Sequence, residues 1–407
     1  MNMQAKDIIA SSLKLLGVIG LLAGLVLNPV TIARFLTPDG EIDSVRTLFG
    51  IITLEIILVG AGAYCMVNAR TLSQKIITFR KELALSFAVF LVALVFLDQL
   101  MRLVLPPTYS VSEFGWMRQP ESVVRKSVED SPGQIRQIVS TVEENGFKRW
   151  GHVDSTGKKV LIVGDSFTEM TYVSNGEEWY AYLEEAYPDI DFFVFGAGGY
   201  GTLQEYLVLD TFIDRIDPDV VIWQFCDNDY GDNLYEWDIA RYPHNSFSYR
   251  PYLENGEVVY RLPVPYAGVR SKSRIADYLL RTYDNQLQYH ARKRYFANKE
   301  SEPPPAISAE IEARALEVTR TILSMVRDRT VDRDVFLFSA QEIGPKEMEL
   351  CAGTGIRCIP GVDAHIQSAA AEGLAVTVVD DGHWNTVGNR LAGEFLADYF
   401  RQANVFR

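Results

Sequence analysis

The stretch 160-VLIVGDSFTEM-170 decides the fold of this chain, because four apolar residues run directly into a glycine, an acid and a hydroxyl. A short aliphatic run of this kind is typical of a buried strand that brings polar side chains to the edge of a sheet. Four further runs have the same character: DFFVFGA (191–197), DVVIWQFC (219–226), DVFLFSA (334–340) and LAVTVV (374–379). Helical stretches, such as 177–186 and 309–327, separate several of them. This alternation predicts an α/β fold with a parallel sheet covered by helices on both faces.

Polar residues or glycines follow four of these five runs. They are GDS (164–166) after the first, GAGGYG (196–201) after the second, CDND (226–229) after the third and DDGH (380–383) after the last. In an open parallel sheet, ligands bind beyond the carboxyl ends of the strands. We therefore expect these four segments to meet at one edge of the sheet and to form a catalytic site.

The same segments resemble the motifs of a known superfamily. In this order, GDSF, GAGGYG, DND and DGHWN are similar to those of the SGNH (GDSL-type) hydrolases, and DGHWN also resembles their polysaccharide O-acetyltransferase branch. The resemblance covers about 159–400. It implies an α/β, flavodoxin-like three-layer sandwich with a parallel sheet, and a serine esterase or acyltransferase that needs no cofactor.

The resemblance also implies roles for individual residues. Ser166 is the expected nucleophile and His383 the expected base, because a serine hydroxyl becomes reactive when a neighbouring base takes its proton. A carboxylate must hold the histidine in the correct tautomer. Asp-x-x-His spacing selects Asp380 for this role and Asp-x-His spacing selects Asp381, and we favour Asp381.

The expected oxyanion donors are the main-chain N–H groups of Ser166 and Gly199 and the side-chain amide of Asn228, again by resemblance. Each site residue also has a purely structural interpretation. Ser166 is suited to cap the helix that follows it, and Asn228 to an Asx turn. His383, beside Trp384, is equally compatible with a packed, hydrogen-bonded histidine.

Two other classes of protein are alternatives. Residues 196–201 match G-x-G-x-x-G after a strand, the fingerprint of dinucleotide-binding Rossmann proteins. This interpretation leaves GDSF and DGHWN without a role, and the loop follows the second strand of the unit rather than the first. A non-catalytic membrane scaffold with a hydrolase fold is the other alternative, which the complete set of polar groups disfavours. An ordinary α/β-hydrolase is also disfavoured, because no G-x-S-x-G elbow is evident.

Three apolar segments, at about 15–33, 47–67 and 83–105, precede the sheet within a predicted membrane region 1–107. Each has about the 20 residues that a helix needs to cross a bilayer, so we predict three transmembrane helices. The connection 68–82 carries four basic residues, whereas the first connection is mainly acidic, so the positive-inside rule places 68–82 in the cytoplasm. The protein is then a multi-pass protein of the plasma (inner) membrane, with its catalytic domain on the periplasmic or extracellular side. Asp98 and Arg102, four residues apart in the third segment, are predicted to pair.

The rest of the chain is divided by composition. Residues 108–158 are predicted to be a linker with one helix near 134–144, and the catalytic domain takes 159–407 with an insertion at about 232–305. Within the insertion, Asn255-Gly256 is a strong hairpin-turn signal, and EPPP (302–305) ends it. The run YHARKRY (289–295) is typical of a solvated helix face, with a membrane-surface or anionic-glycan contact as the alternative.

Composition restricts the partners. The net charge of -14 argues against nucleic acid, and five scattered histidines predict no metal site. Cys351 and Cys358 are suited to a small disulfide loop if the domain faces an oxidising compartment, while Cys65 and Cys226 are expected to be buried thiols. The expected substrate is an O-acyl, including O-acetyl, ester of a cell-envelope glycan or lipid. The other expected partners are the membrane and an envelope-glycan assembly protein. The sequence leaves hydrolysis and acyl transfer open.

Overall fold

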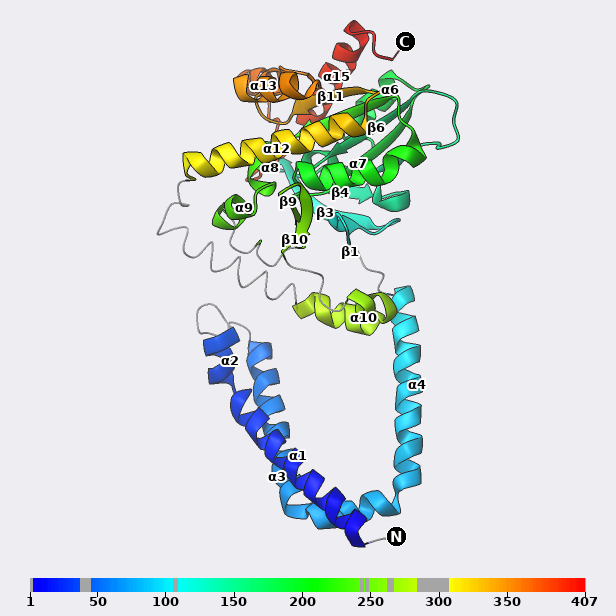
Figure 1. Ribbon diagram of the computed structural model, residues 1–407, viewed down its shortest axis with the longest axis vertical. Helices are drawn as coiled ribbons and strands as arrows, with labels where there is room; N and C mark the ends of the chain where they lie inside the picture. The colour runs from blue at the N-terminus through cyan, green and yellow to red at the C-terminus, as the bar shows by residue number, and fades with distance from the viewer. Residues whose placement is uncertain are drawn as a thin grey trace. The chain divides into compact units, whose positions relative to one another are not determined.

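The computed structural model describes residues 3–36, 45–104, 109–241, 245, 249–261, 267–283 and 307–406. The chain divides into two compact units, residues 1–106 with 266–303, and residues 107–265 with 304–407 (Figure 1). The basic run 289–295, EPPP, Pro106-Pro107 and the acidic residues of the first connection lie outside the described residues.

The first unit contains the apolar helices. They are α1 (Met3–Val26), the short α2 (Pro29–Leu36), α3 (Val45–Thr78) and α4 (Arg80–Val104). Three segments are long and apolar enough to cross a membrane, as predicted: Lys6–Val26, Leu48–Thr78 and Arg80–Arg102. The first begins and ends earlier than expected. It ends early because Asn28 starts a new helix, its Oδ1 accepting the Thr31 main-chain N–H at 2.9 Å. Gly17 and Gly62 let α1 and α3 approach closely, since a Cβ on either would lie 2.7 Å from the carbonyl oxygen of the other.

Part of the insertion folds with these helices. It forms α10 (Ala267–Lys272) and a helix at 274–283. The Asp98 carboxylate accepts hydrogen bonds from Ser273 Oγ at 2.8 Å and from the Ile275 main-chain N–H at 2.9 Å, and so caps the second helix. Arg102 Nε lies 3.2 Å from Asp98 Oδ2, which confirms the predicted pair.

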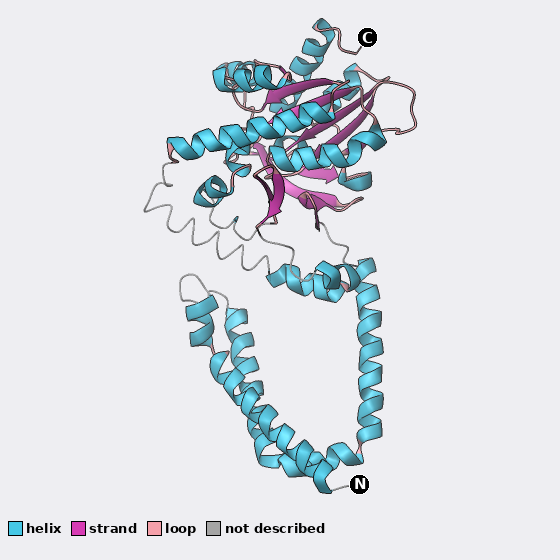
Figure 2. Ribbon diagram, viewed as in Figure 1, coloured by secondary structure: helices cyan, strands magenta, loops and turns pink. Residues whose placement is uncertain are grey.

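The second unit is built on a six-stranded sheet with the order β12-β11-β8-β6-β7-β5. Figure 2 shows the strands of this unit in magenta. Its strands are β5 (Arg149–Trp150), β6 (Lys159–Gly164), β7 (Asp191–Gly196), β8 (Val220–Phe225), β11 (Asp334–Ser339) and β12 (Arg357–Cys358). All neighbours are parallel except β5 and β7. Counted from β6, the order 2-1-3-4-5 is flavodoxin-like, as expected.

Four of the five predicted strands are confirmed, and the fifth is wrong. Residues 374–379 contribute an isolated bridge between Thr377 and Trp384, and β12 occupies the edge position beside β11. The chain turns back immediately afterwards at Asp380, which has a φ of 57°. This turn, rather than a continued strand, is what brings His383 to the sheet edge.

Alternate residues of the strands pack against different helices. Val160 and Ile162 belong to a core with α6 (Trp179–Ala186), α14 (Val362–Ala371) and α15 (Thr386–Gln402). Leu161 and Val163 belong to a core with α7 (Thr202–Ile216), α12 (Ala309–Arg329) and α13 (Pro345–Thr354). Figure 1 shows α7 and α12 side by side on one face. The three layers and the predicted helices at 177–186 and 309–327 are therefore present.

Residues 109–150, expected as a linker, are structured. They form the hairpins β1 (Tyr109–Ser112) with β2 (Gly115–Arg118) and β3 (Val123–Ser131) with β4 (Gln134–Thr141), a short 3-10 turn η1 (Glu144–Gly146), and β5. The helix predicted near 134–144 is wrong. Ile138, 1% exposed, packs against Val128 of the partner strand, and this cross-strand contact favours β structure for a segment rich in β-branched residues.

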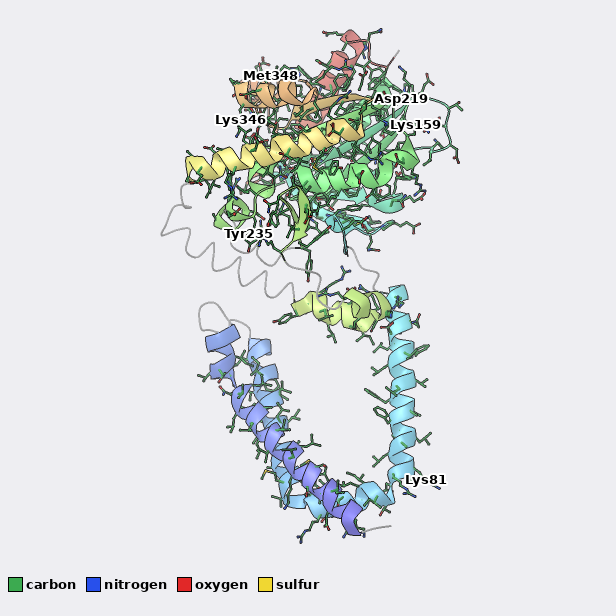
Figure 3. All side chains as sticks on the ribbon, viewed as in Figure 1. Lys81, Lys159, Asp219, Tyr235, Lys346 and Met348 are labelled. Carbon is green, nitrogen blue, oxygen red and sulfur yellow. A yellow bond between two sulfur atoms is a disulfide. The ribbon has the colours of Figure 1, made fainter. Side chains whose placement is uncertain are left out.

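Shorter elements complete the unit. They are α5 (Ser166–Glu169), α8 (Asn228–Asp232), α9 (Tyr235–Arg241) and the hairpin β9 (Pro251–Glu254) with β10 (Glu257–Tyr260). The predicted turn is confirmed, with φ of 53° at Asn255 and 81° at Gly256. Cys351 and Cys358 form a disulfide, Cys226 is buried as expected, and Cys65 is half-buried. Lys159 and Asp219, labelled in Figure 3, mark the amino-terminal edge of the sheet, opposite the site described next.

Candidate active site

Ser166 lies at the start of α5, directly beyond the carboxyl end of β6. The helix cap is not Ser166 but Asp165, whose Oδ1 accepts the Phe167 main-chain N–H at 2.9 Å. The Ser166 hydroxyl instead lies 2.7 Å from Nε2 of His383. The capping interpretation of Ser166 is therefore wrong, and its catalytic role stays a prediction.

His383 connects Ser166 to a carboxylate. Asp381 Oδ1 contacts Nδ1 of the His383 ring and also accepts the His383 main-chain N–H at 3.1 Å. Because a carboxylate only accepts, the ring proton belongs on Nδ1, and Nε2 is left to accept from the Ser166 hydroxyl. Asp380 is exposed at the preceding turn. The structure thus brings Ser166, His383 and Asp381 together, as the Asp-x-His spacing predicts, and leaves Asp380 apart.

Aromatic rings hold His383 from both sides. The centroids of the Phe167 and Tyr172 rings lie 4.7 and 4.5 Å from that of the imidazole, both stacked. Burial opposes ionisation of Asp381, but hydrogen bonds from His383 and Tyr172 lower its pKa overall. Burial and the Asp381 carboxylate raise the pKa of Tyr172, so its phenol stays protonated and donates. The Asp381 carboxylate is therefore kept charged beside the imidazole.

The glycine loop 196–201 follows β7, and its peptide groups are held on both sides of Gly198. The Gly198 carbonyl accepts the Trp116 indole N–H at 2.9 Å, and the Gly198 N–H donates to Glu169 Oε2 at 2.8 Å. Arg118 Nε donates to the other oxygen of Glu169. Gly199 has a φ of 73°, a conformation that favours glycine.

Asn228 begins α8, directly beyond β8. Its Nδ2 donates to Asp232 Oδ2 at 2.7 Å. β6, β7 and β8 are neighbours, so Ser166, Gly199 and Asn228 all follow the carboxyl ends of adjacent strands at the point where the strand order reverses. Their role as oxyanion donors stays a prediction.

The tryptophan and asparagine of the DGHWN motif stabilise the loop that contains His383. Trp384 is 3% exposed and its ring contacts that of Phe167, with centroids 5.0 Å apart. Asn385 caps α15, its Oδ1 accepting the main-chain N–H groups of Val387 at 2.9 Å and Gly388 at 3.0 Å. The tryptophan and asparagine therefore fix the loop that carries the base.

Buried carboxyl groups lie at the same strand ends. Asp165 is 1% exposed, and Glu205 and Asp229 are fully buried. Burial raises the pKa of all three. Repulsion from Asp165 raises the pKa of Glu205 further, and repulsion from Glu205 and then Asp165 raises that of Asp229. A raised pKa favours the neutral form of these groups, which limits the negative charge near Ser166.

The glycine loop is a poor pyrophosphate site. A dinucleotide would need the free N–H groups of the loop, but that of Gly198 is taken by the carboxylate of Glu169. Among the described residues, no group of three histidine, cysteine or acidic side chains is arranged to hold a metal ion.

Sequence reasoning missed Trp116, Arg118, Glu169 and Tyr172. The first two were overlooked because 108–158 was expected to be a linker. The available signal was the spacing of Trp116 and Arg118, since residues two apart on a strand share one face. Glu169 and Tyr172 lie shortly after the GDSF motif, where no spacing distinguishes a packing residue from a site residue.

No protein-family model and no curated protein matches the sequence. Solved structures that are similar include a lipolytic protein of the G-D-S-L family from Veillonella parvula, with 11% identity over 60% of this chain and 100% of the other, and a TM-score of 0.32. A psychrotrophic esterase from Pseudoalteromonas sp. has 10% identity over 61% and 99%, with a TM-score of 0.34. An acetyl xylan esterase from Butyrivibrio proteoclasticus has 12% identity over 66% and 67%, with a TM-score of 0.30. At these values, the case for a function depends on the geometry of the site.

Proposed function

We propose that this protein is a membrane-anchored serine esterase or O-acyltransferase of the SGNH type. The observation that carries the proposal is the line of contacts from the Ser166 hydroxyl, 2.7 Å from His383 Nε2, through the imidazole to Asp381. A hydroxyl, an imidazole and a carboxylate in this order are the groups with which serine hydrolases attack esters.

The reaction begins when Ser166 Oγ attacks the acyl carbon and His383 Nε2 takes its proton. The carbonyl oxygen becomes an oxyanion, for which the main-chain N–H groups of Ser166 and Gly199 and the amide of Asn228 are the proposed donors. The bond to the alcohol then breaks, and His383 returns the proton to the leaving oxygen. Asp381 stabilises the imidazolium in both steps.

The acyl-serine is released by a second nucleophile. Water gives hydrolysis and a sugar hydroxyl gives transfer, with His383 as base in either case. The proposed substrates are O-acyl esters, including O-acetyl esters, of cell-envelope glycans or lipids.

The proposed location supports this class of substrate. Three apolar helices and the basic connection 68–82 favour an outward-facing catalytic domain. The Cys351–Cys358 disulfide is compatible with an oxidising compartment, where such bonds persist.

A fluorophosphonate probe tests the nucleophile directly. The full-length protein in detergent should be labelled, peptide mapping should locate the adduct on Ser166, and Ser166→Ala should lose both labelling and turnover of p-nitrophenyl acetate. The variant should unfold at the temperature of the wild type, because Asp165 supplies the helix cap. Ser127→Ala, at an exposed position on β3, is the matched control and should keep both properties. Turnover that persists in Ser166→Ala would overturn the assignment.

A further inference from the structure

We infer that Trp116 and Arg118, on β2 outside the central sheet, are positioning residues that orient the Gly199 N–H toward the developing oxyanion. The inference rests on the function proposed above. It gives a catalytic purpose to the β1–β2 hairpin, which pairs with no strand of the central sheet among the described residues.

The first step concerns one peptide group. The Gly198 carbonyl and the Gly199 N–H belong to the same trans peptide and so point in opposite directions. The Trp116 indole N–H donates to that carbonyl at 2.9 Å. Because a peptide between two glycines rotates easily, this hydrogen bond selects the orientation in which the Gly199 N–H points away from the Trp116 indole nitrogen.

Trp116 is itself held in place, which a positioning role requires. Its main-chain carbonyl accepts from the Tyr200 hydroxyl, and its ring meets that of Tyr200 edge-on, with centroids 5.7 Å apart. The guanidinium of Arg250 lies 5.3 Å from the centroid of the indole ring. The indole N–H therefore has little freedom to follow a moving loop.

The preceding peptide group is fixed from the nucleophile helix. Glu169, three residues after Ser166 on α5, accepts the Gly198 N–H at 2.8 Å. The helix that presents Ser166 and the loop that presents Gly199 are thus tied through one carboxylate. Two proposed oxyanion donors are kept in register by this contact.

A carboxylate at this position carries an electrostatic cost. Glu169 is 7% exposed, and its negative charge next to the glycine loop would oppose a developing oxyanion. Arg118 forms an ion pair with it, and both side chains are largely buried. Arg118 therefore lets the carboxylate hold Gly198 while its charge is compensated.

The test compares variants of the full-length protein in detergent. Trp116→Phe keeps an aromatic ring and removes the indole N–H. We expect kcat for p-nitrophenyl acetate to fall about tenfold with KM within about twofold, since loss of a whole oxyanion donor costs about 10²–10³. Trp150→Phe, the same change on β5, is the control and should keep both constants. The fluorophosphonate labelling rate should fall in parallel with kcat.

A charge-compensated pair gives a second, independent readout. Arg118→Met should lower kcat by more than about tenfold, because it leaves a buried charge uncompensated. Adding Glu169→Gln should recover at least half of that loss on a logarithmic scale, since a neutral amide oxygen still accepts the Gly198 N–H. A purely structural ion pair predicts that both changes alter the unfolding temperature while kcat of the folded protein stays the same.

The outcomes separate this inference from the proposed function. A wild-type protein that neither turns over esters nor reacts with the probe would overturn both. An active wild type with full kcat in Trp116→Phe would overturn the positioning role alone, and so would an Arg118→Met defect that Glu169→Gln fails to relieve. If Arg118→Met does not fold, Trp116→Phe decides the question by itself.

Discussion

Replacing Asp381 by Asn removes one negative charge beside His383 and leaves the size of the side chain nearly unchanged. In the wild type, one oxygen of Asp381 accepts both the ring Nδ1–H and the main-chain N–H of His383, the latter at 3.1 Å. Hydrogen bonds to a charged group contribute about 1.5–3 kcal/mol each. An asparagine that turns its NH₂ toward Nδ1 would also move the ring proton to Nε2, which then cannot accept from Ser166.

The expected magnitude follows from these two effects. Loss of imidazolium stabilisation and the wrong tautomer together should cost about 3–5 kcal/mol in the transition state, or about 10²–10⁴ in kcat/KM. Asp380→Asn is the matched control, because Asp380 is the neighbouring acid and is exposed. It should change kcat/KM by less than about threefold.

Both variants are assayed as full-length protein in detergent with p-nitrophenyl acetate, and their unfolding temperatures are recorded beside the wild type. The reasoning requires a large kinetic loss in Asp381→Asn without a matching loss of stability. Equal losses in the two variants, or a larger loss in Asp380→Asn, would show that the Asp-x-His assignment is wrong.

Two further predictions concern stability and topology. Burial lowers the pKa of Lys148 to about 8 from its ordinary 10.5. Between pH 8 and 10.5 the unfolded chain then binds more protons than the folded one, so the free energy of unfolding should rise with pH. Measured by thermal unfolding, the wild type should gain at most about 3 kcal/mol relative to Lys148→Met across this window. A difference that does not change with pH would contradict this prediction. Glu257→Cys, beside the β9–β10 turn, should react with a membrane-impermeant maleimide in intact cells, whereas Lys81→Cys (Lys81 is labelled in Figure 3) should react only after permeabilisation. The reverse pattern would place the catalytic domain in the cytoplasm.

The central sheet was predictable because its strands are buried on both faces. Continuous apolar runs such as 160–163 can therefore be recognised from the local sequence alone. Because the strands are parallel, the residues that follow them lie at the same edge of the sheet. The same argument placed Ser166 at this edge. His383 and Asp381 follow a segment that is not a strand of the sheet, so their position beside Ser166 was implied by the resemblance and not by the strand pattern. The choice between Asp380 and Asp381 depended on a spacing, and the turn at Asp380 explains it physically.

The errors come from segments whose structure depends on tertiary contacts. Residues 134–141 form a strand because β3 lies beside them. The sequence of a short run with mixed polarity does not show which strand it pairs with. Residues 374–379 have the composition of a strand, but the chain turns at Asp380 and so places His383 beside Ser166. Neither competing requirement is local, so neither was visible in the sequence.

The hairpins β1–β2 and β3–β4, in the segment expected to be a linker, contact the candidate site. β2 contacts the glycine loop through Trp116, and through Arg118 by way of Glu169. β3 contacts the loop that carries His383. The Asp130 carbonyl accepts from Asn385 Nδ2 at 2.8 Å, and the Asp130 side chain accepts the Thr386 main-chain N–H at 3.2 Å. The Glu129 carbonyl also accepts the Val379 main-chain N–H at 3.1 Å. Both loops of the site are therefore fixed from a segment that precedes the sandwich in the chain. The sheet places Ser166, whereas the position of His383 depends on contacts with residues that the motifs alone do not include.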